Sequence, residues 1–332
     1  GAGDLRSSSF LYAGGLGVLA GDHLKEASDL GLPLTAVGFV YNQGYFSQKI
    51  TEDGWQETRN AVLNFGEMPI LPVMDGEGKP LTISVELPGR DVHARIWTIQ
   101  VGRLNLYLLD TNVEQNSPVD QQLTARLYSN DPEVRISQEI LLGMGGVRAL
   151  RKLGIEPTVW HMNEGHSAFL TIERIRELVQ NGKSFDQAAE IIRKGNIFTT
   201  HTPVPAGNDQ FPLWLVDKFF ANTWPQLNLT RDQFVGLGLQ AQSWGEAFVM
   251  PVLALKLSDA ANAVSELHGQ VSRRMWQWMW PERAEADIPI THITNGVHTG
   301  TWLARRMRLL FERYLGSDWL ERFDDPSLWD HI

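Results

Sequence analysis

The sequence contains no cysteine among its 332 residues. Disulfide bonds, zinc sites built from thiolates and cysteine nucleophiles are therefore excluded. The sequence also lacks an apolar run long enough to span a membrane, and its first residues do not form a signal-peptide pattern. We therefore expect a cytoplasmic protein with no membrane partner.

Positive charge is scarce as well. Lysine and arginine number 29 against 39 aspartates and glutamates, which gives a net charge of −10. A nucleic-acid partner is disfavoured because no broad cationic surface is available to neutralise phosphates. The remaining composition, with 43% hydrophobic and 20% charged residues, is typical of a globular protein with a sizeable core.

Hydrophobic periodicity predicts alternating helices and strands over much of the chain. The pattern indicates helices at 18–30, 131–154 and 164–180, and strands at 32–41, 157–163 and 196–204. This alternation favours a Rossmann-like, doubly wound α/β domain. Residues 81–109 alternate with period two and predict an antiparallel insertion, placed at about 55–110. Residues 247–280 suggest further helix, and 290–302 a strand followed by a turn.

Three glycines, Gly14, Gly15 and Gly17, precede the first expected helix. A glycine turn at a helix N-terminus offers unpaired backbone N–H groups to an anion. The spacing matches neither the dinucleotide fingerprint nor the Walker loop. An ordinary tight turn and an anion cradle both remain compatible with this stretch.

The segment "HMNEGH" carries His161, Glu164 and His166. Zinc-protease helices place two histidines four residues apart, whereas these two are five apart and are expected on different elements. We therefore predict no metal site. The loop should follow the carboxyl end of a strand, where open α/β sheets bind ligands.

Two further loops carry polar candidates. His201 follows an apolar strand in "FTTHTPV", where it is either a satisfied core histidine or part of a site. Asn295 in "ITNGVHTGTW" could bind a hydroxyl group as donor and acceptor at once. The alternative for Asn295 and Gly296 is a type I′ turn.

Five long segments occur in a characteristic order, and together they resemble the α-glucan (glycogen/maltodextrin) phosphorylase family in its bacterial and archaeal form. They are "YAGGLGVLAGDHLKEASDLGLPLTAVGFVYNQGYFSQKI", "EQNSPVDQQLTARLYSNDPEVRISQEILLGMGGVRALRKLGIEPTVWHMNEGHSAF", "FTTHTPVPAGNDQF", "ANAVSELHGQVSRRMW" and "ITNGVHTGTWL". The resemblance covers nearly the whole chain from Leu11 onward.

The resemblance implies a two-domain (GT-B type) glycosyltransferase that cleaves α-1,4-glucans with inorganic phosphate to release glucose 1-phosphate. It implies pyridoxal 5′-phosphate as the cofactor, used through its phosphate group. It is also compatible with a homodimer.

Individual site residues follow from the same resemblance. Gly14 and Gly15 would present backbone N–H groups to the substrate phosphate, and His201 would lie beside the glucosyl unit as the catalytic histidine. Asn295 would bind a sugar hydroxyl. Glu164 and His166 would lie on the acceptor side of the cleft.

The resemblance also sets expectations for the extent of the chain. Family members are about twice as long, and their Schiff-base lysine lies in a C-terminal domain that we do not find here. We therefore expect the N-terminal half: a glucan-binding domain at 1–315 and the start of an inter-domain connection at 316–332. Alone, it should bind no pyridoxal phosphate and be inactive.

Other functions remain open beside this one. A glycogen or starch synthase shares the architecture and a glycine-rich loop, although "NEGHSAF" and "TNGVHTGTW" fit a phosphorylase better. A non-catalytic glucan-binding module is a second alternative, and a metallohydrolase is a distant third.

Overall fold

The computed structural model describes residues 15–43, 47–59, 65–126, 129, 131–243 and 245–330. Gly14, one of the two glycines expected to face an anion, lies outside these residues. Within the described ranges, no helix combines the length and the apolar character that crossing a membrane requires.

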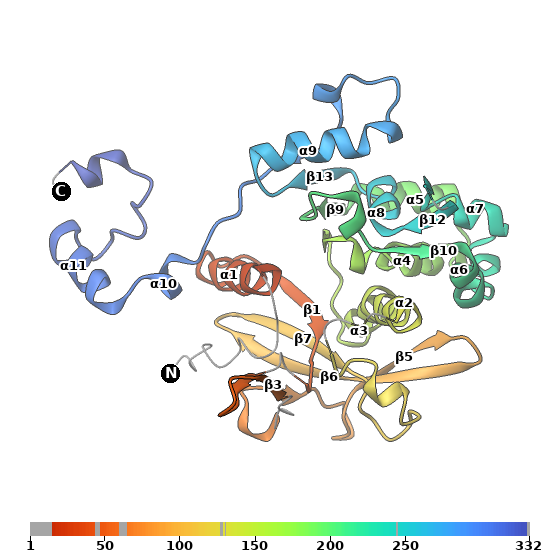
Figure 1. Ribbon diagram of the computed structural model, residues 1–332, viewed down its shortest axis with the longest axis horizontal. Helices are drawn as coiled ribbons and strands as arrows, with labels where there is room; N and C mark the ends of the chain where they lie inside the picture. Colours follow the sequence, from red (N-terminus) through yellow and green to blue (C-terminus); the bar gives the residue numbers. More distant parts are fainter. Residues whose placement is uncertain are drawn as a thin grey trace.

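Two main sheets and the helices around them organise the chain, as Figure 1 shows, so the expected α/β class is confirmed. The mixed sheet contains β1 (Thr35–Phe39), β4 (Leu71–Pro72), β5 (Thr82–Leu87), β6 (Arg90–Val101) and β7 (Leu104–Asp110). The second sheet contains β8 (Trp160–Asn163), β9 (Asn196–Thr199), β13 (Ala260–Ala263) and β14 (Thr291–His292). A smaller antiparallel sheet contains β10 (Gln210–Pro212), β11 (Leu239–Gln242) and β12 (Gly245–Val249).

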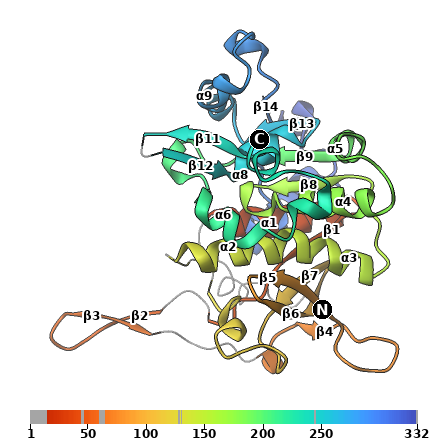
Figure 2. The ribbon, with the colours of Figure 1, turned by 90° about the vertical axis from the view of Figure 1, so that its right-hand side faces the viewer.

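The helices connect and cover these sheets. They are α1 (Gly15–Asp29), α2 (Pro132–Ile140), α3 (Gly146–Lys152), α4 (Leu170–Gln180), α5 (Phe185–Lys194), α6 (Leu213–Phe220), α7 (Arg231–Val235), α8 (Met250–Lys256), α9 (Glu266–Trp276), α10 (Thr299–Trp302) and α11 (Arg305–Leu315). A separate hairpin of β2 (Ser47–Ile50) and β3 (Gln56–Arg59) projects from the side of the molecule in Figure 2.

The second sheet is parallel throughout, in the order β14-β13-β9-β8. The first expected strand, β1, lies outside this sheet and pairs in parallel with β7. The antiparallel strands β5, β6 and β7 therefore share one sheet with β1. Parallel strands have all their carboxyl ends at one edge, and this edge of the second sheet positions the candidate site.

The helix expected at 131–154 lies between the two main sheets (Figure 1). The Asp131 side chain caps it, accepting the Glu133 N–H at 2.8 Å, and Gly154 follows it with φ +69°. Its middle is a turn of π-helix, Leu141–Gly145, that periodicity did not predict. A Cβ on Gly143 would lie 2.6 Å from the backbone nitrogen of Leu170, so glycine permits the close approach to α4.

The expectation of a helix over 247–280 was wrong for part of that range. The segment begins within β12, continues as α8, crosses the parallel sheet as β13 and returns as α9. α8 ends before Ser258 and Asp259, and Ser265 caps α9 by accepting the His268 N–H at 3.1 Å. These polar residues separate α8 from β13 and β13 from α9, and the high overall hydrophobicity of the segment concealed these boundaries.

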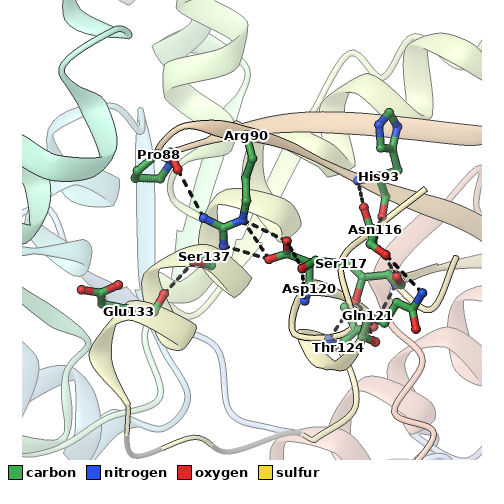
Figure 3. A network of polar contacts seen from close by, with 11 residues as sticks. Pro88, Arg90, His93, Asn116, Ser117, Asp120, Gln121, Thr124, Glu133 and Ser137 are labelled. Atoms are coloured by element: carbon green, nitrogen blue, oxygen red, sulfur yellow. Dashed lines mark hydrogen bonds and ion pairs between the residues drawn. The ribbon is translucent and has the colours of Figure 1, made fainter. Parts of the chain in front are cut away.

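A polar network fastens the connection after β7 onto β6 (Figure 3). Arg90 donates to both carboxylate oxygens of Asp120 at 2.8 to 3.0 Å. Asn116 accepts the His93 N–H at 2.8 Å and donates to the carbonyls of His93 and Thr111 at 2.7 and 2.8 Å. The route from the mixed sheet to α2 is thereby fixed.

The C-terminal part of the chain packs on α1 and then departs from the main body. Trp302 Nε1 donates to Asp22 Oδ2 at 2.7 Å, and Lys25 Nζ donates to Thr301 Oγ1 at 3.0 Å. Beyond these contacts, α11 stands apart in Figure 1. Leu315, Trp319 and Leu328 form a small core of their own there.

Replacing Gly143 by alanine tests the close packing of the π-turn against α4. Because the new Cβ meets backbone rather than a movable side chain, we expect the free energy of unfolding to fall by about 1–3 kcal/mol. Urea denaturation measures this. The control is Gly21→Ala in α1, where a Cβ meets nothing within 4 Å and helix propensity should add about 0.5–1 kcal/mol. Equal stability of G143A and wild type would contradict the packing argument.

Candidate functional site

The carboxyl ends of the parallel strands bring most of the predicted site residues to one edge. Glu164 and His166 follow β8, and His201 follows β9 by two residues. Asn295 joins them through its backbone, whose N–H donates to the Val264 carbonyl at 3.0 Å just after β13. The sequence prediction that the loop with Glu164 and His166 follows the carboxyl end of a strand is confirmed.

Glu164 ties the loop after β8 to the loop after β9. Its Oε2 accepts the backbone N–H groups of His201 and Thr202 at 2.8 and 3.0 Å and the Thr202 hydroxyl at 3.1 Å. Its Oε1 accepts the Gly165 N–H at 3.0 Å. The residue is 7% exposed and has φ +75°, a conformation that costs energy for a residue with a side chain. The buried carboxylate of Glu164 therefore links the two loops through its hydrogen bonds.

His201 is held in one tautomer by Asn163. Its Nε2 lies 2.6 Å from the Asn163 Oδ1, which can only accept, so Nε2 carries the hydrogen. Burial lowers the pKa of His201, and His166 and His268 add to that effect against the opposing charge of Glu164. The neutral ring therefore has its lone pair at Nδ1, ready to accept a hydrogen bond.

A second network of polar side chains joins the strands β8, β9 and β13. His161 Nε2 lies 2.7 Å from Thr199 Oγ1, whose hydroxyl donates to Asn262 Oδ1 at 2.9 Å. The His161 ring also meets His23 of α1 edge-on, with centroids 6.2 Å apart. α1 is thus placed against the end of β8.

The start of α1 and the Asn295 loop complete the list of predicted residues. Gly15 is the first described residue of α1, about 12 Å along the helix from His23. Asn295 is exposed, and neither it nor Gly296 has a positive φ. A type I′ turn needs positive φ at both central residues, so the turn alternative for Asn295 is wrong.

His166 lies in the turn Gly165–Ser167, which faces α2. Its Nδ1 is 3.3 Å from Asp209 Oδ2, and Asp209 also pairs with Arg135 of α2. Across the described part of the chain, no group of three or more histidine, aspartate or glutamate side chains is arranged to hold a metal ion.

Comparison with known proteins finds relatives along nearly the whole chain. It is 46% identical to the maltodextrin phosphorylase of Thermococcus litoralis over 96% of its residues, and 40% identical to the glycogen phosphorylase of Aquifex aeolicus over 99%. The glycogen phosphorylase of Mycobacterium tuberculosis is 45% identical over 97%.

The chain is therefore similar to part of each of these phosphorylases. It spans 39%, 47% and 38% of the length of these three relatives, respectively. No family model matches the chain.

The sequence did not single out three polar residues at this edge of the sheet. Asn163 precedes Glu164 in "HMNEGH", and Asp209 closes "PAGND", so both lie inside motifs that were quoted for other residues. Arg135 lies in a helix far from both motifs in sequence. Asn163 and Asp209 could have been found as polar residues within or beside a recognised motif. Arg135 could not, because only the packing of α2 brings it near them.

Glu139 lies one helical turn beyond Arg135 and is 4% exposed. Its Oε2 has no hydrogen-bond partner in the structure. Burial raises the pKa of Glu139 to about 8, against a smaller opposing effect of the Arg135 charge. Glu139 is therefore neutral at pH 7.

Glu139 makes stability depend on pH. Because its folded-state pKa lies above the value of 4.5 expected when unfolded, its contribution is present below pH 4.5 and is lost as the pH rises through about 8. Relative to E139Q, the wild type should lose up to about 4 kcal/mol of unfolding free energy over that window.

Urea titrations at pH 5 and pH 8 on both proteins measure the difference. The half-buried Glu133 of the same helix gives the control, because E133Q keeps Glu139 and should still lose stability between pH 5 and pH 8. Identical pH dependence in wild type and E139Q would show that Glu139 ionises normally.

Proposed function

We propose that this chain forms the glucan-binding part of an α-1,4-glucan phosphorylase, an enzyme that transfers a terminal glucosyl unit to inorganic phosphate and releases glucose 1-phosphate. The observation that carries the proposal is the loop after β9, which Glu164 holds by its backbone while Asn163 leaves His201 Nδ1 free. A sugar hydroxyl is a suitable donor to that nitrogen.

Each predicted residue then has a role in this proposal. His201 accepts a hydrogen bond from the glucosyl unit and presents its backbone beside the bond to be cleaved. Asn295 binds another sugar hydroxyl, and the backbone N–H groups of Gly14 and Gly15 face the phosphate at the positive end of α1. Fixed dipoles of this kind stabilise an oxocarbenium-like transition state beside an anion.

The acceptor side of the proposal concerns Glu164 and His166. Both carboxylate oxygens of Glu164 already accept hydrogen bonds from protein donors. Glu164 therefore acts by shaping the loop, and the direct contact with the acceptor sugar falls to His166, whose side chain is 36% exposed.

Pyridoxal 5′-phosphate is the cofactor that the family resemblance implies. The polar residues at the edge include no lysine that could form its Schiff base, so they do not fit the attachment of the cofactor. We derive no step through it and propose that these residues bind glucan.

The domain division is also a proposal. Residues 1–315 would form the glucan-binding domain and 316–332 the start of a connection to a second domain. A small core of Leu315, Trp319 and Leu328 joins the end of α11 to this connection.

A maltoheptaose titration followed by tryptophan fluorescence tests the assignment of His201. Loss of one hydrogen bond to a neutral group should weaken binding about tenfold in H201A, a change of about 1.4 kcal/mol. H93A, on the opposite sheet, is the matched control and should bind as the wild type does. Equal affinities for H201A and wild type would contradict the role of His201.

Product analysis separates the phosphorylase proposal from its alternatives. The chain incubated with maltoheptaose, phosphate and pyridoxal phosphate should bind the sugar and release no glucose 1-phosphate. Release of glucose 1-phosphate would contradict the proposal that this part is inactive alone. Glucosyl transfer from ADP-glucose would favour the synthase.

A further inference from the structure

His166 lies at one end of a network of three contacting side chains, each of which comes from a separate element. Asp209, in the loop before β10, places its Oδ2 3.3 Å from His166 Nδ1. Its other oxygen, Oδ1, pairs with Arg135 on α2. The Asp209 side chain is only 12% exposed, so this contact is shielded from solvent.

The hydrogen-bond donors and acceptors of these three side chains determine which ring nitrogen of His166 carries the hydrogen. An ionised carboxylate only accepts hydrogen bonds, and Asp209 is paired with the guanidinium of Arg135. His166 Nδ1 must therefore carry the hydrogen that it shares with Asp209. In the neutral ring the lone pair is then at Nε2, and no hydrogen bond among the described residues engages that atom.

Burial favours the neutral form of the ring. Burial by the surrounding protein lowers the pKa of His166, the charge of Glu164 opposes this, and the charge of Arg135 adds a smaller lowering. Arg135 therefore acts twice, because it pairs with Asp209 and disfavours a positive charge on His166.

We propose that Arg135 and Asp209 are positioning residues that hold His166 with its hydrogen on Nδ1, so that Nε2 of the neutral ring accepts a hydrogen bond from a hydroxyl group of the bound glucan. This inference rests on the proposed function and adds to it two residues that act through His166. A histidine held in the opposite tautomer would offer that hydroxyl a donor instead of an acceptor.

A purely structural role for the same residues makes different predictions. An Arg135–Asp209 pair that merely fastened the loop to α2 would affect stability alone. The His166 tautomer would then be undetermined. Glucan affinity would also be the same whether the amide of a substituted residue 166 lies at the position of Nδ1, as in H166N, or of Nε2, as in H166Q. Both differences can be measured on the chain itself.

The tautomer is measured directly by NMR of ¹⁵N-labelled histidine rings at pH 7, with the His166 signals assigned from H166Q. We expect a neutral ring protonated at Nδ1 in the wild type and a shift toward the Nε2–H form in D209A. D217A breaks the exposed Asp217–Arg231 pair and is the control that should leave His166 unchanged. A charged or Nε2-protonated His166 in the wild type, or no change in D209A, would overturn the inference.

Maltoheptaose affinity tests the role of Nε2. A glutamine side chain reaches the position of Nε2, whereas asparagine reaches only that of Nδ1. We therefore expect H166N and H166A to bind about tenfold more weakly than wild type, H166Q within about threefold, and D209A between these limits. Equal affinities for H166N and H166Q would contradict the role of Nε2.

The two measurements distinguish failure of this inference from failure of the proposed function. A wild-type chain that shows the Nδ1–H form but does not respond to maltoheptaose would contradict glucan binding, and with it the proposed function. A chain that binds maltoheptaose equally well as wild type, D209A and H166N would contradict the positioning role alone.

Discussion

The hydrogen bonds that Glu164 makes across two strand ends are the constraint on which the candidate site depends. One buried carboxylate accepts backbone N–H groups from the loop after β9 and from its own turn. Buried charges are costly unless such donors satisfy them, so the residue cannot leave the contact cheaply. The positive φ of Glu164 adds strain that this contact sustains. The orientation of His201 follows from where the carboxylate holds its backbone.

Most of the alternating α/β pattern could be predicted from the sequence, because a glycine ends the helix before each of β8 and β9, at Gly154 and Gly195. The prediction failed where one apolar run forms several elements. Residues 247–280 form strand, helix, strand and helix, and the short polar breaks at Ser258 and Ser265 decide the boundaries. The pairing of β1 with β7 was equally inaccessible, since sheet partners depend on contacts between distant segments.

The candidate site was predictable where a motif follows a strand and was hidden where it depends on packing. Glu164, His166 and His201 stand in loops that the strand pattern marks as ligand-binding positions. What the sequence could not provide was their chemistry. Glu164 can link the two loops only when the loop after β9 folds beside it. The tautomer of His166 depends on Arg135, which α2 brings in from a distant part of the chain.

We propose that the carboxyl edge of the parallel sheet binds glucan, and a crystal structure of the chain with maltoheptaose would locate the sugar. We expect a sugar with one hydroxyl within hydrogen-bond distance of His201 Nδ1 and another beside Asn295, with Glu164 still bound to the loop. A sugar bound only on another surface of the molecule, with the edge empty, would rule out glucan binding at this edge.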